Sequence, residues 1–321
     1  MANKRVIWCD TDTLSKDVSG KVYIVTGANS GVGLETTRQL VKQGGHVVMA
    51  CRRVSAGEEE AKAFQGLKGS FEVMACDLAN LQSVRDFAEA FLKKYDRLHG
   101  LMCNAGMVVM GNKIQFTQNG FEMTMGVNFI GHFLLTELLL EVLKKSAPAR
   151  IGLLSSVVHA GSPKNRYQVH LEDLNFQQRN YNNFAAYGEA KVATVQYALE
   201  LADRLKGTGV TTASIHPGWA RSNFGKGGNL LMRSLMAVAK PLTRSISDSN
   251  EEAAQTSLHV LLSDDAPKHS GAYFSQHSVL YRDKECKKGG WPMQSPNPHA
   301  HDMDAARKLV KKSYELVGLD A

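Results

Sequence analysis

The chain has 321 residues, of which 43% are hydrophobic and 21% are charged. This length and apolar content suit one large α/β domain with a sizeable core. The net charge of +7 favours anionic ligands, and because no run of Lys and Arg is interleaved with aromatic residues, we expect no nucleic-acid partner. The cysteines form no close pair and have no metal-ligand spacing, so we expect reduced thiols and no metal site; they are Cys9, Cys51, Cys76, Cys103 and Cys286.

Residues 1–19 form a polar extension without the apolar run of a signal peptide. The longest apolar run, Phe133–Leu140, is interrupted by Thr136 and Glu137. It is far shorter than the roughly 20 residues that cross a bilayer. We therefore expect neither a signal peptide nor a membrane-spanning segment, and a location in the cytoplasm or peripherally on a membrane surface.

Three glycines follow the first predicted strand. The apolar run Val22–Val25 leads into Thr-Gly-Ala-Asn-Ser-Gly-Val-Gly at 26–33, where a helical pattern begins that ends at Gly44. Lacking a Cβ, glycines let the backbone approach a pyrophosphate, whose charge is stabilised by free N–H groups at the start of a helix. An ordinary glycine-rich turn is the alternative. The expected phosphate contacts are Gly27, Asn29, Ser30, Gly31, Val32 and Gly33.

A second strand, His46–Cys51, ends in Arg52 and Arg53, about 20 residues beyond the glycine turn. In a dinucleotide site this position contacts the adenosine ribose, where an acidic residue would bond the 2′-hydroxyl. A guanidinium instead suits a 2′-phosphate through forked, charge-assisted hydrogen bonds. Two solvated arginines on a loop are the alternative. The pattern favours NADP(H) over NAD(H), with Arg52 as the contact.

Two further strands are predicted at Phe71–Cys76 and Leu98–Cys103. The first ends in Asp77 and Leu78, before a helical pattern over residues 80–95, for which these two residues are a candidate cap. The second is closed by a tripeptide of small residues, Asn104, Ala105 and Gly106.

A long helix is predicted over residues 120–145, with Asn128 on its otherwise apolar side. An amide there costs free energy unless it is hydrogen-bonded, so Asn128 has either a functional role or a structural one in a helix kink. A fifth strand follows at Arg150–Ser156. The irregular stretch after it, 157–184, is longer than a compact domain usually carries without a function, and we expect it to line a substrate cleft.

Tyr187 and Lys191 lie four residues apart at the start of the next helix, so both point to the same side. A phenol is a poor acid or base at neutral pH, and a neighbouring ammonium stabilises its anion and lowers its pKa. The same spacing occurs by chance in many helices. Coming after a glycine turn and a strand that ends in Ser155 and Ser156, it predicts an acid–base pair.

The sixth strand, Val210–His216, ends in Pro217, Gly218 and Trp219. Between 222 and 247 there is no acidic residue, while Lys and Arg alternate with Leu and Met. Three interpretations compete: a substrate lid over about 219–247, a surface helix that contacts anionic lipid through 226–244, and plain core packing. A helix at Glu251–Leu262, a seventh strand at Gly271–Ser275, a loop at 282–301 and a last helix from Asp302 to Val317 complete the chain.

In this order, these motifs resemble the short-chain dehydrogenase/reductase family over residues 20 to about 275. Within that family the chain resembles the branch that holds retinol dehydrogenases, WW-domain oxidoreductases and light-dependent protochlorophyllide reductases. The residues that carry this second likeness are Ala50-Cys51-Arg52, His132, the long gap between Ser156 and Tyr187, and Tyr314–Gly318. The resemblance implies a single-domain α/β fold, a Rossmann-type doubly wound parallel sheet of about seven strands. The catalytic domain would span 20–280, with a C-terminal loop and helix, 281–321, packed on it.

The resemblance also implies a role for each motif. Tyr187 would transfer the proton, Lys191 would bond the nicotinamide ribose, Ser156 would hold the carbonyl oxygen, and Asn128 would bind the water of a proton relay. The cofactor would be held by the glycine turn and by residues at the strand ends, namely Arg52, Asp77, Leu78, Asn104, Ala105, Gly106, Tyr187, Lys191, Pro217, Gly218, Trp219 and Ser222.

The expected reaction is hydride transfer between NADP(H) and the carbonyl or alcohol carbon of a lipophilic aldehyde or ketone, either retinal-like, aliphatic or steroid-like. One alternative is a C=C reductase similar to protochlorophyllide reductases, although those carry Cys where this chain has Trp219. The other is a catalytically silent NADP-binding regulatory protein, against which Ser156, Tyr187 and Lys191 all argue. Monomer and homodimer both remain open.

Overall fold

The computed structural model describes residues 6–111, 113–220, 247–278 and 283–320. Within these ranges the strands form one sheet in the order β3-β2-β1-β4-β5-β6-β7-β8. Neighbouring strands are parallel except β7 and β8, which are antiparallel. The strands are β1 (Val22–Thr26), β2 (His46–Cys51), β3 (Ser70–Ala75), β4 (Gly100–Cys103), β5 (Ala149–Leu154), β6 (Val210–His216), β7 (Tyr273–Ser275) and β8 (Gly290–Met293).

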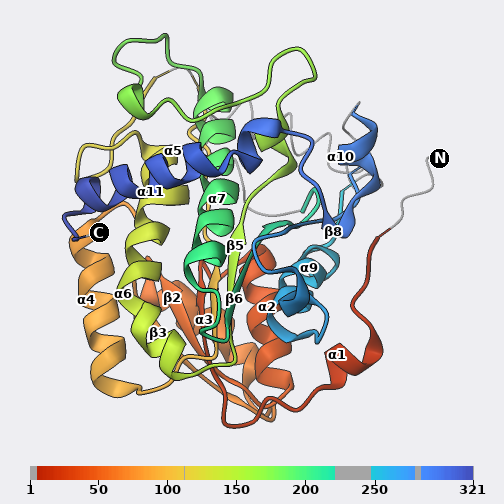
Figure 1. Cartoon of the computed structure of the whole chain (residues 1–321). Helices are drawn as coiled ribbons and strands as arrows, with labels where there is room; N and C mark the ends of the chain where they lie inside the picture. The colour runs from red at the N-terminus through yellow and green to blue at the C-terminus, as the bar shows by residue number, and fades with distance from the viewer. Residues whose placement is uncertain (1–5, 112, 221–246, 279–282, 321) are drawn as a thin grey trace.

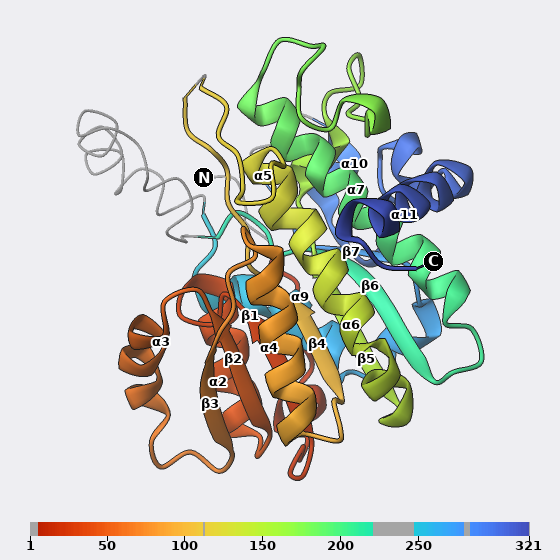
Figure 2. The same cartoon turned by 90° about the vertical axis from the view of Figure 1, so that its left-hand side faces the viewer.

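Helices cover both faces of this sheet (Figures 1 and 2). One face carries α4 (Leu81–Lys94), α6 (Gly131–Lys145) and α7 (Asn183–Arg204). The other carries α2 (Gly31–Lys42) and α9 (Asn250–Leu262). The remaining helices and helical turns are α1 (Thr11–Ser15), α3 (Val54–Ala61), η1 (Lys62–Phe64), α5 (Met123–Met125), η2 (Gly126–Ile130), η3 (Val157–Ala160), η4 (Leu171–Asp173), η5 (Ala266–His269), α10 (Lys284–Lys288), η6 (Pro298–His301) and α11 (Met303–Val317).

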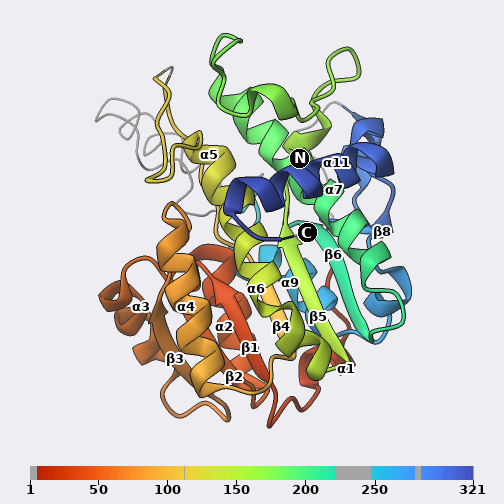
Figure 3. The same ribbon diagram turned by 60° about the vertical axis from the view of Figure 1, so that its left-hand side comes forward.

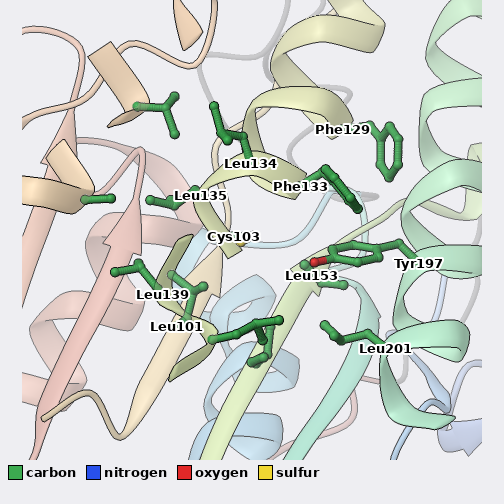
Figure 4. Close-up of a cluster of buried hydrophobic side chains, with 14 of the residues drawn as sticks. Leu101, Cys103, Phe129, Phe133, Leu134, Leu135, Leu139, Leu153, Tyr197 and Leu201 are labelled. Atoms are coloured by element: carbon green, nitrogen blue, oxygen red, sulfur yellow. The ribbon is translucent and has the colours of Figure 1, made fainter. Parts of the chain in front are cut away.

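Alternate residues of the central strands supply a separate core on each face. In β1, Ile24 packs with α4 and α6, whereas Tyr23 and Val25 pack with α2 and α9. Both faces of the parallel strands are therefore apolar, as burial between two helical layers requires. Figure 4 shows part of the first core, where Leu101 of β4 and Leu153 of β5 lie close to aromatic and aliphatic side chains of α6 and α7.

The C-terminal helix α11 crosses α6 and α7 (Figure 3). The ring of Phe133 lies 5.0 Å from that of Tyr197 and 5.2 Å from that of Tyr314, between ring centres. Glu137 accepts a hydrogen bond of 2.6 Å from each of the two tyrosine hydroxyls. Arg204 completes the cluster by donating to Glu137 at 2.7 Å. One buried carboxylate thus joins three helices.

The prediction of a Rossmann-type sheet is confirmed, with one strand more than expected. That strand, β8, lies in the stretch 282–301 for which the sequence predicts a loop. Pro292 argues against a strand at this place in the sequence, because proline is rare in strands except at the edge of a sheet. β8 is such an edge strand. Elsewhere the strand bounds agree within two residues, and Val210–His216 agrees at both ends.

The continuous helix Met123–Lys145 is long and apolar enough to cross a membrane by length and composition, with a mean hydropathy of 1.4. No single apolar run in the sequence suggests this, because Thr136 and Glu137 interrupt the pattern. Of the most apolar window, 78% is buried inside the protein. The core helix of a soluble domain passes the same test, so the finding is weak evidence for a span.

Replacing Phe133 by Ala should lower the free energy of unfolding by about 3–5 kcal/mol, because the ring is fully buried and its removal leaves a cavity between α6, α7 and α11. Leu92→Ala is the matched control, since this side chain is 45% exposed on α4. Urea unfolding followed by circular dichroism measures both. Equal losses in the two variants would contradict the packing described for Phe133.

Candidate active site

The strand order changes direction between β1 and β4, and in open α/β sheets ligands bind in the crevice outside such a point. Between β1 and α2 the chain turns at this crevice. Gly27 and Gly31 have φ angles of 64° and 59° there, which glycine adopts without strain. A Cβ on Gly33 would lie 2.4 Å from Nδ2 of Asn104. Only glycine therefore lets α2 pack this closely on the loop that follows β4.

The amino end of α2 opens at the same crevice. Ser30 is the N-cap residue, and among the described residues its side chain makes no capping hydrogen bond. The first N–H groups of a helix have no acceptor within the helix. The backbone amides of Gly31, Val32 and Gly33 are thus available to an anion, with Asn29 and Ser30 half-buried beside them.

The Thr26 hydroxyl, at the end of β1, holds the loop after β4 in place. Its oxygen accepts from the backbone N–H groups of Asn104 and Ala105, each at 2.9 Å, and lies 2.9 Å from Nε2 of His132. The other ring nitrogen of His132 lies 3.3 Å from the carbonyl oxygen of Asn128, which can only accept. Nδ1 therefore carries the proton, and Nε2 accepts from the hydroxyl. Burial lowers the pKa of His132 to about 3, so the ring is neutral.

Arg52 lies beside the glycine turn. The sulfur of the preceding residue, Cys51, is hydrogen-bonded by the backbone of Ala28 and Asn29. Cys51 is buried and Arg52 is exposed. Within the described part of the chain the Arg52 guanidinium forms no ion pair, so it is available to a phosphate at the edge of the crevice.

The two residues after β3, Asp77 and Leu78, lie at the same edge of the sheet. One oxygen of Asp77 accepts from the N–H of Ala79 at 3.0 Å, and the Asp77 N–H donates to Oγ of Ser83 at 3.0 Å. The residue that caps α4 is Asn80. Asp77 is therefore held in a tight turn, and Leu78 is buried beside it.

Asn128 is buried in the π-helical segment η2, which interrupts the long helix. Its side-chain oxygen accepts from the N–H of Met107 at 2.8 Å, and its nitrogen donates to the Met107 carbonyl at 2.8 Å. A Cβ on Gly106 would lie 2.9 Å from the Asn128 oxygen and 3.6 Å from Nζ of Lys191. A cavity of about 10 Å³ borders Asn128, His132 and other residues, which is about the room of one water.

Ser156, Tyr187 and Lys191 meet just beyond the carboxyl end of β5. The Ser156 hydroxyl hydrogen-bonds that of Tyr187. Nζ of Lys191 donates to the Leu154 carbonyl at 2.6 Å and lies 5.6 Å from the centre of the Tyr187 ring. Ser155 fixes the helix from the other side, because its hydroxyl donates to the Lys191 carbonyl at 2.9 Å.

The sequence predicts that Lys191 lowers the pKa of Tyr187, whereas in the structure this pKa is raised. Burial raises the pKa of Tyr187 to about 12, and the hydrogen bond from Ser156 opposes this rise. Burial also lowers the pKa of Lys191 to about 7. Both side chains are buried, so loss of hydration dominates. The phenol is thus protonated at neutral pH, and its raised pKa makes it a weaker acid than an ordinary tyrosine.

Pro217, Gly218 and Trp219 follow β6 at the same edge, and Gly218 has a φ of 88°. Asp248 holds this turn: its carboxylate accepts from the N–H of Trp219 at 2.8 Å, and its own N–H donates to the Trp219 carbonyl at 2.8 Å. Ser222 and the basic segment 226–244 lie outside the described residues, as does most of the expected lid.

Several residues of the site escape sequence analysis. Thr26, Met107 and Asp248 act through backbone groups of distant segments, and no spacing pattern marks such contacts. His132 appears in the sequence only as a mark of the branch. In the described part of the chain no three His, Cys, Asp or Glu side chains could hold a metal ion.

Comparison with known proteins places this geometry in a family. Residues 21–166 match the family model described as short chain dehydrogenase. Retinol dehydrogenase 13 from Homo sapiens is 38% identical over 307 residues, which are 95% of this chain and 86% of that protein. The chain belongs to the short-chain dehydrogenase family. Retinol dehydrogenase 12 from Homo sapiens is 40% identical to this short-chain dehydrogenase, over 94% of this chain and 87% of that protein.

A solved structure of an uncharacterised protein from Mycobacterium paratuberculosis resembles this short-chain dehydrogenase throughout. Its TM-score is 0.73 at 28% sequence identity, covering 95% of this chain and 96% of that one. Membership of the family makes the protein an oxidoreductase that binds a nicotinamide cofactor. The uncapped end of α2 and the crevice between β1 and β4 fit the phosphates of such a cofactor.

Replacing Thr26 by Val should destabilise the protein by about 1–3 kcal/mol and weaken cofactor binding, since two N–H groups and one imidazole lose their partner. Thr36→Val is the matched control. Thr36 is also fully buried, but its hydroxyl only donates to the Val32 carbonyl one turn earlier. Urea unfolding and calorimetric NADPH titration measure both effects. Equal losses in the two variants would contradict the network around Thr26.

Proposed function

We propose that the protein is an NADP(H)-dependent oxidoreductase that interconverts a lipophilic aldehyde or ketone and its alcohol. The observation that carries this proposal is the convergence of Ser156, Tyr187 and Lys191 at the end of β5, at the same edge of the sheet as the glycine turn after β1. The names of the similar retinol dehydrogenases favour a retinal-like substrate among lipophilic carbonyls.

The nicotinamide supplies or accepts the hydride when it is bound. Tyr187 gives its hydroxyl proton to the carbonyl oxygen as negative charge develops there. Burial keeps the phenol protonated until then but also makes it a weaker acid, so the Lys191 ammonium must stabilise the phenolate as it forms. Ser156 donates a hydrogen bond to the same oxygen. Lys191, with a pKa near neutrality, can pass a proton toward Tyr187. Asn128, whose side-chain oxygen lies near Gly106 as the Lys191 nitrogen does, would hold the water of such a relay.

The apolar character of the substrate is supported by the exposed aromatic residues around the site. Phe184 is 60% exposed and lies one helical turn before Tyr187 on α7, so both point to the same side. Trp219 is 37% exposed directly after the Gly218 turn. Large exposed rings beside a reactive group are typical of a binding site for an apolar ligand. We also propose that Trp219 and Ser222 border the nicotinamide, and that segment 226–244 covers the substrate or contacts lipid.

Tyr187→Phe should reduce kcat for all-trans-retinal about 10²- to 10⁴-fold, because the variant lacks the donated proton but keeps the ring. The dissociation constant of NADPH should stay nearly unchanged. NADPH oxidation in the dark and calorimetric titration measure the two quantities. A variant with the wild-type kcat would exclude Tyr187 as the acid, and a wild type that turns over no aldehyde, ketone or steroid in a broad panel would contradict the proposed reaction.

Arg52→Asp should weaken NADPH about 10- to 100-fold and leave NADH nearly unchanged, because the variant loses a charge-assisted bond to the 2′-phosphate and adds repulsion. Arg53→Asp is the matched control: it makes the same charge change at the next residue, at the N-cap of α3, where Asp is well tolerated. Calorimetric titration with NADPH and with NADH measures both dissociation constants for each variant. An unchanged preference in Arg52→Asp would remove this residue from the ribose site.

A further inference from the structure

The turn that follows Ser156 is fixed by a buried histidine. Ser156 precedes the short 3₁₀ turn η3, and its hydroxyl accepts from the N–H of Val158 at 3.2 Å. His159, fully buried in this turn, approaches the Ser156 carbonyl twice, with its backbone N–H at 3.1 Å and with Nδ1 at 2.5 Å. A carbonyl can only accept, so Nδ1 carries the ring proton and Nε2 is an acceptor.

The C-terminal segment 295–297 supplies the hydrogen-bond donor for Nε2 of His159. Oγ of Ser295 lies 2.5 Å from Nε2 of His159 and therefore donates to it. Asn297, also fully buried, donates from its amide to the carbonyls of His159 and Tyr167 at 2.7 and 2.8 Å. The ring of Tyr273 in β7 packs edge-on against the imidazole, with 4.9 Å between ring centres. The His159 ring is therefore bonded at both nitrogens and packed against an aromatic ring.

This arrangement involves no charge on the histidine. Burial lowers the pKa of His159 to about 4, and the titratable or charged groups near it, His301, Arg166 and His216, lower it further or are themselves held neutral by burial. The ring therefore stays neutral at the pH of any ordinary assay. Its effect on Ser156 depends on hydrogen-bond geometry alone.

We propose that His159 is a positioning residue for Ser156, and that Ser295 and Asn297 set its position. The N–H of Ser155 is the last group of this segment that bonds to β6, at 2.7 Å from the Ile215 carbonyl. The carbonyl of Ser156, one residue further on, is held by the backbone and ring of His159. The segment that holds the ring lies outside residues 21–166, which match the family model. This inference rests on the proposed function only in that Ser156 is taken to bind the substrate oxygen.

Ser295→Ala tests the inference in two independent ways. It removes the donor to His159, so hydrogen exchange of the His159 and Gly161 amides should become about tenfold faster, a readout that needs no substrate. With all-trans-retinal, kcat per folded molecule should fall about tenfold, while the dissociation constant of NADPH stays unchanged. Ser295→Thr keeps the hydroxyl and should restore both quantities.

Ser313→Ala is the matched control, because Ser313 is equally buried near the C-terminus but donates only to the Leu309 carbonyl within α11. Wild-type exchange in Ser295→Ala would overturn the coupling. Faster exchange with an unchanged kcat would overturn the positioning role. A wild-type protein that turns over no carbonyl compound would contradict the proposed function, while the exchange result would still decide whether the C-terminal segment holds the Ser156 turn.

Discussion

The hydrogen bonds of the Thr26 hydroxyl are the interaction on which the cofactor side of the site depends. A parallel sheet brings the ends of β1 and β4 to one edge, but it does not by itself fix the loops that leave them. The Thr26 hydroxyl fixes them. It accepts from two consecutive backbone amides of the loop after β4 and donates to His132. His132 carries the constraint on to the widened helical turn at Asn128. The glycine turn, the small-residue loop and the long helix are thus joined through a single side chain.

A second neutral histidine has the corresponding position on the catalytic side. His159 ties the turn after β5 to the C-terminal segment, as His132 ties the turn after β1 to the long helix. Both rings are buried, and both are bonded at each nitrogen. A neutral imidazole is one of few side chains that offers one donor and one acceptor on a rigid frame. A neutral imidazole can therefore join two loops when one loop offers a hydrogen-bond donor and the other an acceptor.

The sequence predicts the fold and the chemical groups well because their signals are local. The glycine turn, the strand ends and the four-residue spacing of Tyr187 and Lys191 are each visible within a few residues. The pKa of Tyr187 is not local: burial raises it against the expected effect of Lys191, and burial depends on the whole fold. β8 was missed for a related reason, since its place at a sheet edge, where Pro292 is tolerated, is a property of the finished sheet. The contacts of Thr26 and Ser295 are likewise invisible, because each joins segments far apart in the chain.

The cluster around Glu137 has a consequence for the mobility of the helices that border the crevice. α6 and α7 meet with a carboxylate between them, and Tyr314 of α11 supplies one of its donors and one ring against Phe133. Because the same carboxylate also accepts from Tyr197 of α7, α7 cannot slide along α6 without breaking that bond. The two helices therefore move as one body, and any opening of the crevice is left to the loops at their amino ends.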